Sequence, residues 1–234
     1  MYFISAPFGN YLHFKNAISV HGTFTTNPRK GIFSQILKTL RYVKTDAGWA
    51  WRNKLGLRNP GIKEGMLNTS YNSILSIAAL EPKDRTYFKL MLSPNRNIEL
   101  NVSCPNLDTH DDTTAWSDFD KFPEHMRGDW CIVKVPPTAS EELIDRIVDK
   151  GYTQIHASNT LQTEKGGLSG KILVPHTLGI ISLLKRKYPH VQVIAGGGVS
   201  SPEDADKYLE EGADHISLGS VCFTPWKIKK IINR

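Results

Sequence analysis

Apolar residues recur along the chain in short runs, and this pattern predicts eight β-strands. Each run is five to seven residues long and contains Val, Ile or aromatic side chains, which favour extended structure. The runs cover residues 2–6, 17–22, 73–79, 98–103, 131–135, 154–158, 191–196 and 215–219.

Helical patterns lie between the later runs. The expected helices cover residues 140–151, 175–189, 201–213 and 225–234. Ser140 is a typical N-cap residue, and Gly151 is typical of a helix end. Pro202 fits the first helical position, with acidic residues in the turn that follows and Gly212 at the end.

Strands that alternate with helices predict a parallel (β/α)8 TIM barrel, formed by one domain over residues 1–234. A doubly wound open sheet is the alternative, but eight strands favour the barrel and no GxGxxG motif follows the first strand. The N-terminal βα units are trimmed, because only about ten residues separate the first two strands, too few for an ordinary crossover helix. About fifty residues separate the second and third strands, which predicts an elaborate loop on one face.

Composition and charge are those of a globular protein. Of 234 residues, 40% are hydrophobic and 22% are charged, enough for one sizeable core. Neither a transmembrane helix nor a signal peptide is predicted. Three widely spaced cysteines indicate no zinc site and a reducing, cytoplasmic location. The net charge of +6 comes from scattered Lys and Arg typical of solvated helix faces, so neither a nucleic acid nor a membrane is expected as a partner.

The C-terminal ends of the strands, where TIM barrels place their active sites, carry polar residues or glycine. Turn chemistry explains many of these positions, but it does not explain Lys134 within an apolar strand. A lysine there must point its ammonium at an anionic or electron-rich group. The other strand-end positions are Thr23, Ser76, Asn101, Asn106, Ser158, Asn159, Thr160, Gly197, Gly198, Gly219 and Ser220.

Glycines after the last two strands predict a phosphate site. "IAGGGVSS" (194–201) and "ISLGSV" (216–221) each end a strand and present backbone N–H groups that no side chain obstructs. Loops at these two positions form the recurring phosphate site of such barrels. Plain tight turns are the alternative, and the motif does not identify the ligand.

The motif "NVSCPN" (101–106) predicts recognition of a flat polar ring. A neutral amide both donates and accepts, which suits a ring that carries C=O and N–H groups, such as a pyrimidine. The amides that fit this role are Asn53, Asn101, Asn106 and Asn159. Cys104 could act as a general base, and the acidic loop after Pro105 as a lid. Turn residues and a small buried hydrophobe are the alternative interpretations.

Together the motifs resemble the dihydroorotate dehydrogenase family, the flavin enzymes of pyrimidine biosynthesis. They occur in the family's order: "NKLGLRNPG" (53–61), "NVSCPN" (101–106), "VKVPP" (133–137), "SNT" (158–160), "GGLSGK" (166–171) and "IAGGGVSS" (194–201). A cysteine at 104 resembles the soluble class 1 enzymes, and "ILSIAAL" (74–80) resembles class 1A.

The resemblance implies a barrel with FMN at its top, hydride transfer from C6 of dihydroorotate to flavin N5, and Cys104 as the base at C5. Lys134 would lie near flavin N1 and O2 and stabilise the anionic reduced flavin. Substrate contacts would come from Asn53, Gly56, Leu57, Asn101, Asn106, Asn159 and Thr160. Cofactor contacts would come from Ala6, Thr23, Asn101, Lys134, Ser158, Ser169, Gly170, Gly197, Gly198, Gly219 and Ser220. A homodimer is expected, and a metal is not.

The chain departs from the family pattern around its first two strands. Pro7 follows Ala6 and removes a backbone donor where the flavin should approach. The family lysine near flavin and substrate has no counterpart, and Asn10 or His21 occupies its place. Two alternatives therefore stay open: a flavin-dependent reductase of another pyrimidine, similar to dihydrouridine synthase, or a non-catalytic flavin-binding remnant.

Overall fold

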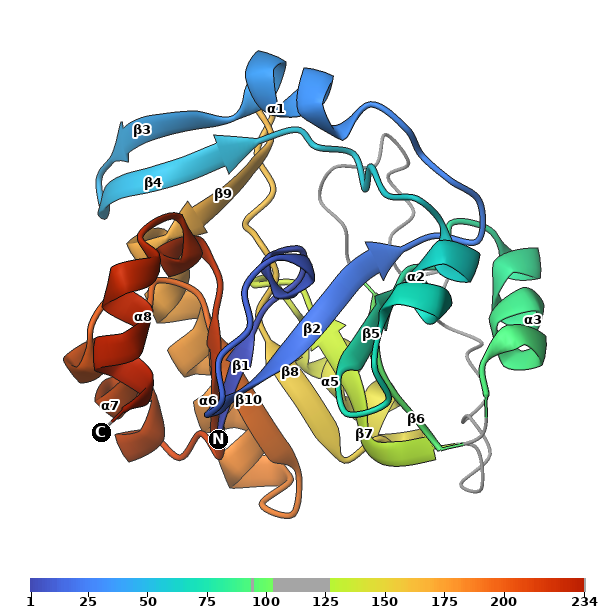
Figure 1. The fold of residues 1–234 in the computed structure, drawn as a ribbon. Helices are drawn as coiled ribbons and strands as arrows, with labels where there is room; N and C mark the ends of the chain where they lie inside the picture. Colours follow the sequence, from blue (N-terminus) through green and yellow to red (C-terminus); the bar gives the residue numbers. More distant parts are fainter. Residues whose placement is uncertain (94, 103–126, 234) are drawn as a thin grey trace.

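The computed structural model describes residues 1–93, 95–102 and 127–233. Among these residues, eight strands close into a parallel barrel in the order β1-β11-β10-β8-β7-β6-β5-β2 (Figure 1). The strands are β1 (Tyr2–Ile4), β2 (Ala17–Phe24), β5 (Ile74–Ile77), β6 (Arg96–Asn101), β7 (Arg127–Val135), β8 (Gln154–Ala157), β10 (Gln192–Gly196) and β11 (His215–Leu218). The eight predicted strands and the TIM barrel are confirmed.

All of the described α-helices except the first surround the barrel and bury its outer face. The α-helices of the described residues are α1 (Ile32–Thr39), α2 (Ile62–Asn68), α3 (Pro82–Met91), α5 (Glu141–Asp149), α6 (Val174–Lys187), α7 (Pro202–Glu210) and α8 (Pro225–Ile232). The four predicted helices are confirmed, and Ser140 is an N-cap whose hydroxyl oxygen accepts the N–H of Leu143 at 3.3 Å. None of the helices in the described ranges has the length and apolar character needed to cross a bilayer.

The first βα unit is trimmed, as the sequence predicts. Within the described residues, only the short 3-10 helix η1 (Phe8–Asn10) lies between β1 and β2. Gly9 packs directly on β2, since a Cβ atom there would lie 2.3 Å from the carbonyl oxygen of Val20. The Asn10 side chain accepts the N–H of Gly22 at 2.9 Å and donates to its carbonyl at 3.3 Å. These contacts attach η1 to the strand that an ordinary crossover helix would cover.

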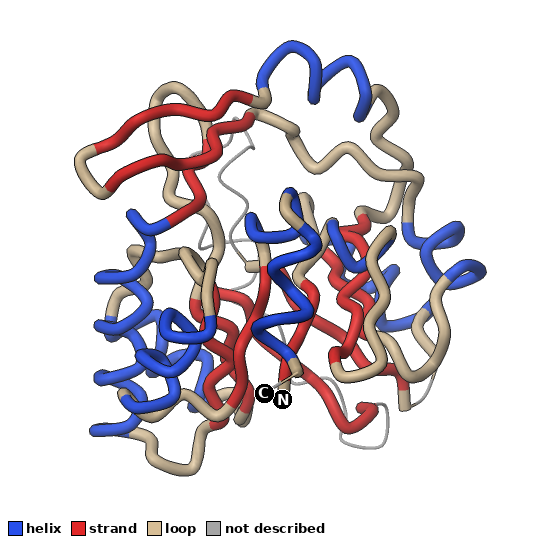
Figure 2. The backbone as a smooth tube through the Cα atoms, turned by 60° about the vertical axis from the view of Figure 1, so that its left-hand side comes forward, coloured by secondary structure: helices blue, strands red, loops and turns tan. Residues whose placement is uncertain are grey.

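A second, three-stranded antiparallel sheet lies over the C-terminal end of the barrel (Figure 2). It consists of β3 (Arg41–Thr45), β4 (Gly48–Asn53) and β9 (Gly167–Gly170) in the order β3-β4-β9. Together with α1 it forms a layer that we call the cap. The sequence predicts an elaborate loop here, and the structure adds that this loop recruits residues 167–170 as its third strand.

Alternation of side chains divides the core into two parts. Five residues from different strands contact one another, which is possible only inside the barrel: Phe3, Val20, Ile74, Ile132 and Ile194. On most of these strands the neighbouring residues point outward and pack with the helices in a larger apolar cluster, to which Ile4 and Leu75 belong. The interior layer forms a floor below the strand ends.

Leu75→Ala tests the outer part of this core. Leu75 on β5 has no exposed surface, so its truncation should lower the free energy of unfolding by about 2–5 kcal/mol. Leu67→Ala on α2 is the matched control, because Leu67 is 81% exposed and should change stability by less than about 0.5 kcal/mol. Urea unfolding measures both; equal losses would contradict this assignment of the core.

Candidate active site

A layer of buried polar side chains lies above the apolar floor of the barrel. Ser5, Ser76 and Lys134 each follow a floor residue by two positions, so they face the same interior. Six described residues form this layer: Ser5, Ser76, Glu99, Lys134, His156 and Ser217. None is more than 7% exposed. The barrel interior is therefore polar directly beneath the strand ends.

Glu99 is the centre of this layer. The hydroxyl of Ser76 donates to one carboxylate oxygen at 2.8 Å, and Nδ1 of His156 lies 2.7 Å from the other. Burial by itself raises the pKa of the Glu99 carboxyl, but the charge of Lys134 opposes this. The hydrogen bonds from His156 and Ser76 lower this pKa further, so that it lies well below its ordinary value and Glu99 is ionised.

His156 is the neutral member of the pair. Burial and the positive charge of Lys134 lower the pKa of the imidazole, against the opposite effect of Glu99. The ring therefore donates its Nδ1–H to the carboxylate as a neutral imidazole. The buried layer thus contains one negative and one positive charge, those of Glu99 and Lys134.

Three of the predicted site residues meet at the barrel mouth. Asn159 donates from Nδ2 to Oδ1 of Asn101 at 2.9 Å. Asn101 in turn donates from its own Nδ2 to the hydroxyl of Thr23 at 3.1 Å. The Thr23 hydroxyl lies 2.9 Å from that of Ser76, which connects the mouth to the polar layer below. The structure therefore brings together residues from β2, β6 and the end of β8.

Other predicted residues line the same end of the barrel. Thr160 donates its backbone N–H to Oδ1 of Asn159 at 2.9 Å. The hydroxyl of Ser158 lies 3.4 Å from that of Thr177 on α6. Ala6 follows Ser5, whose hydroxyl lies 2.6 Å from that of Ser217 on β11. The three predicted residues of this group, Ala6, Ser158 and Thr160, each lie just beyond the end of a barrel strand.

The predicted phosphate loops form a cradle at the ends of β10 and β11. Gly198 has φ +77°, and a Cβ atom there would lie 2.8 Å from Val174 Cγ2 and 3.1 Å from the carbonyl oxygen of Gly170. Gly219 faces open space, since the nearest atom to its Cβ position is 4.0 Å away. Within the described residues, the N–H groups of Gly198 and Gly219 donate to no other group. Free amides without side chains suit a phosphate.

The cap contributes the remaining predicted contacts. Asn53 ends β4 and pairs with Gly167, while Ser169 pairs with Trp51 and donates from its hydroxyl to the Trp51 carbonyl at 3.3 Å. Gly56 and Leu57 follow with positive φ values of 63° and 52°. Two further predicted residues, the base Cys104 and the amide Asn106, lie outside the described residues, as does the acidic loop interpreted as a lid.

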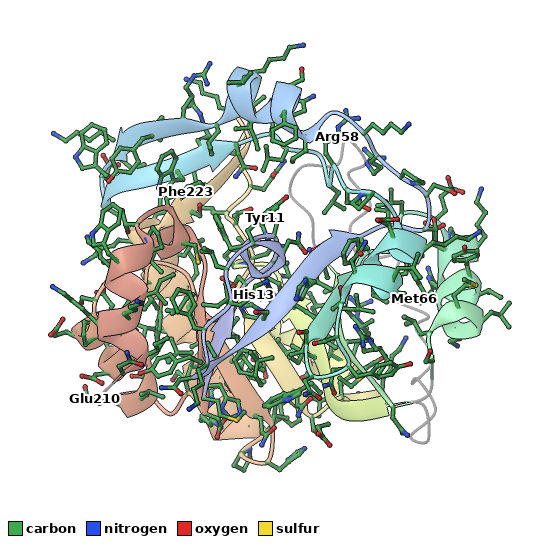
Figure 3. The ribbon with its side chains drawn as sticks, in the orientation of Figure 1. Tyr11, His13, Arg58, Met66, Glu210 and Phe223 are labelled. Atoms are coloured by element: carbon green, nitrogen blue, oxygen red, sulfur yellow. The ribbon has the colours of Figure 1, made fainter. Side chains whose placement is uncertain are left out.

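Aromatic rings connect the cap to the barrel. Trp51 on β4 contacts Phe223 with ring centroids 4.2 Å apart, and Phe223 packs edge-on against Phe8 at 5.0 Å. Phe223 ends the short helix η4 (Ser220–Phe223), which begins at the cradle. Figure 3 shows Phe223 below the β3–β4 hairpin. The sequence prediction missed this contact, because no local pattern relates residues so far apart in the chain.

His21 lies outside the mouth. With Tyr11 and His13 (labelled in Figure 3) it lines a pocket of about 390 Å³ on the outer wall, beside α2. The rings of His13 and His21 stack at 5.6 Å, and burial together with His13 and Arg96 lowers the pKa of His21 to about 4. His21 therefore does not supply the cation of the missing family lysine. No group of three metal-binding side chains is found in the described part of the chain.

Comparison with known proteins identifies the family. A family model described as dihydroorotate dehydrogenase matches residues 10–234. The chain belongs to the dihydroorotate dehydrogenase family. The catalytic subunit of dihydroorotate dehydrogenase B (NAD(+)) from Thermotoga maritima is 29% identical over 245 residues, covering 93% of this chain and 88% of that relative. The same subunit from Staphylococcus carnosus is 26% identical over 228 residues, covering 84% of this chain and 73% of that relative.

A solved structure supports the fold. DHODH from Eimeria tenella in complex with ferulenol superposes with a TM-score of 0.70 at 18% identity. The match covers 93% of this chain and 73% of that one. At this identity the likeness shows the barrel alone. The assignment to the dihydroorotate dehydrogenase family thus follows from the sequence match, and the residue roles depend on the geometry above.

Gly198→Ala tests the cradle. Its positive φ and the close approach of Val174 should make the variant less stable by more than about 1 kcal/mol. Gly179→Ala in α6 is the control, because nothing lies within 4 Å of its Cβ position. It should stabilise the protein by about 0.5–1 kcal/mol, as alanine does in a helix. Urea unfolding of both variants is the measurement, and unchanged stability of Gly198→Ala would contradict the close approach.

Proposed function

We propose that this protein oxidises dihydroorotate to orotate with FMN as its cofactor. The observation that carries the proposal is the hydrogen-bonded pair Asn101 and Asn159 at the mouth, where Asn101 on β6 is the cross-strand partner of the buried Lys134 on β7. Two amides at the strand ends suit a ring with C=O and N–H groups. Membership of the dihydroorotate dehydrogenase family supports the same reaction.

The residues at the mouth fit FMN. The amides of Gly198 and Gly219 would bind its phosphate, with Ser169, Gly170, Gly197 and Ser220 beside them. Lys134 would place a positive charge beneath the ring system and stabilise its anionic reduced form. Ala6, Thr23 and Ser158 would complete the contacts around it. When bound, FMN supplies the acceptor for the hydride that leaves C6 of dihydroorotate.

The substrate would be held by polar groups and deprotonated by a thiolate. Asn101 and Asn159 would fix the pyrimidine ring, and Asn53, Gly56, Leu57, Asn106 and Thr160 would complete the contacts with the ring and its carboxylate. Cys104 would take the proton from C5, so that the proton and the hydride leave neighbouring carbons. A homodimer remains a prediction of the family resemblance, and a cytoplasmic location remains a prediction of the cysteine pattern.

Anaerobic titration with dihydroorotate tests the proposed reaction. The purified protein should be yellow, and dihydroorotate should bleach the flavin absorbance because two electrons pass to FMN. Dihydrouridine, which lacks the carboxylate, should leave the colour unchanged. A protein that takes up no FMN would refute the cofactor assignment. Bound flavin that dihydroorotate does not bleach would instead indicate a non-catalytic member of the family.

Cys104→Ala tests the proposed base. Loss of a positioned acid–base group should slow flavin reduction by dihydroorotate roughly 10²-fold in stopped-flow experiments, while orotate still binds. Cys104→Ser should be intermediate and should recover as the pH rises, because a hydroxyl loses its proton less readily than a thiol.

Cys222→Ala is the matched control for the loss of a thiol. Burial raises the pKa of Cys222 to about 12, so this thiol stays protonated and its removal should leave the reduction rate near that of the wild type. Reduction of Cys104→Ala at the wild-type rate would show that Cys104 takes no part in the chemistry.

A further inference from the structure

The position of Glu99 needs a physical explanation. A carboxylate with 1% exposure in the middle of a barrel is costly unless its charge and its oxygens are compensated. Here both oxygens accept hydrogen bonds, from Ser76 and His156, and Lys134 supplies the opposite charge. Such a complete set of partners indicates a carboxylate that is held ionised beneath the site.

The hydrogen bonds between Glu99 and the mouth have a single direction. A carboxylate can only accept, so the one hydroxyl proton of Ser76 is directed to Glu99. The Ser76 oxygen must then accept its 2.9 Å hydrogen bond from the hydroxyl of Thr23. Thr23 has thereby used its proton, and its oxygen accepts the Nδ2 donor of Asn101.

This direction continues through both amides. Because Nδ2 of Asn101 points to Thr23, its Oδ1 faces Asn159 and accepts the Nδ2 donor of that residue. Oδ1 of Asn159 then accepts the backbone N–H of Thr160. The orientation of each amide, and so which end donates and which accepts, follows from the charge on Glu99. Aligned hydrogen bonds of this kind also strengthen one another.

We propose that Glu99 is a positioning residue, whose carboxylate orients the amides of Asn101 and Asn159 and offsets the positive charge of Lys134 beneath the flavin. The inference deepens the proposed function and depends on it, because these amides are the groups assigned to the pyrimidine. Glu99 itself touches neither substrate nor flavin; it acts through Ser76 and through its electric field.

Glu99→Gln removes the charge and keeps the size of the side chain. The amide oxygen can still accept from His156, but an NH2 group now faces Ser76 and reverses the preferred direction of the chain. The Kd of orotate for the FMN-loaded variant should rise about tenfold, the scale of a hydrogen bond to a charged group. The uncompensated Lys134 should favour reduced over oxidised flavin by about tenfold. That ratio equals a rise of about 30 mV in the two-electron potential.

Ser76→Ala separates the two effects. It breaks the chain between Glu99 and Thr23 but keeps the charge, so orotate binding should weaken about tenfold while the flavin potential stays unchanged. Ser217→Ala is the matched control, because Ser217 lies in the same buried layer but bonds Ser5 on the opposite side. It should alter neither quantity.

The double variant Glu99→Gln/Ser76→Ala tests whether the residues act as one unit. If Glu99 orients the amides through Ser76, orotate should bind the double variant no more weakly than Ser76→Ala alone. If the increases in the orotate Kd of the two single variants multiply in the double variant, the two substitutions act independently, and the inference would be overturned. So would a Glu99→Gln variant with the wild-type flavin potential and orotate Kd.

The same four proteins, the wild type, the two single variants and the double variant, are also compared without flavin. This comparison distinguishes a failure of the inference from a failure of the proposed function. Urea midpoints of the wild type, both single variants and the double variant report whether Glu99 and Ser76 are coupled in the fold. A wild type that binds no FMN but shows coupled midpoints would refute the proposed function and keep the hydrogen-bond chain. If the changes in urea midpoint of the two single variants add up in the double variant, the chain of hydrogen bonds is refuted, whether or not the protein binds flavin.

Discussion

Closure of the ring of parallel strands is the constraint on which the site depends. Side chains alternate between the two faces of a strand, so in a closed barrel every second residue of each strand faces the interior. The layer formed by Phe3, Ile74 and Ile132 fills that interior with apolar groups, and the next layer up is polar. Buried groups such as Glu99 must therefore find their partners inside the ring, on nearby strands, as Glu99 on β6 does on β5, β7 and β8. The charge pattern beneath the mouth is therefore a property of the whole barrel.

Much of the barrel could be predicted from the sequence, because each strand and helix is specified by a pattern within a few consecutive residues. Each strand is an apolar run, and the N-cap at Ser140 is readable from a few residues. Glu99 and His156 were visible as polar residues within such runs, but their contact joins positions 57 residues apart. The same holds for the chain from Ser76 to Asn101, which crosses three strands. Such pairings follow only from the order of strands in the ring.

The cap shows where local patterns fail. Its strands are stabilised by cross-strand aromatic contacts, such as Tyr42 with Trp51, and by the pairing of Trp51 with Ser169, 118 residues later. A short hairpin of this kind is marginal alone, and the local pattern of residues 41–53 does not show that β9 and Phe223 complete it. The glycines of the cradle could be recognised from the motif, whereas their contact with β9 could not.

Strand β9 is part of the cap and also contacts the cradle. Its residues pair with β4 in the cap, and its last residue, Gly170, contacts Gly198 in the cradle. A movement that lifts the cap must therefore either break the β4–β9 ladder or pull on the loop that contains Gly198. Opening of the cap would in this way be linked mechanically to release of the proposed cofactor. If FMN binds as proposed, its lifetime on the protein should reflect the stability of a small surface sheet as well as the contacts of the cradle.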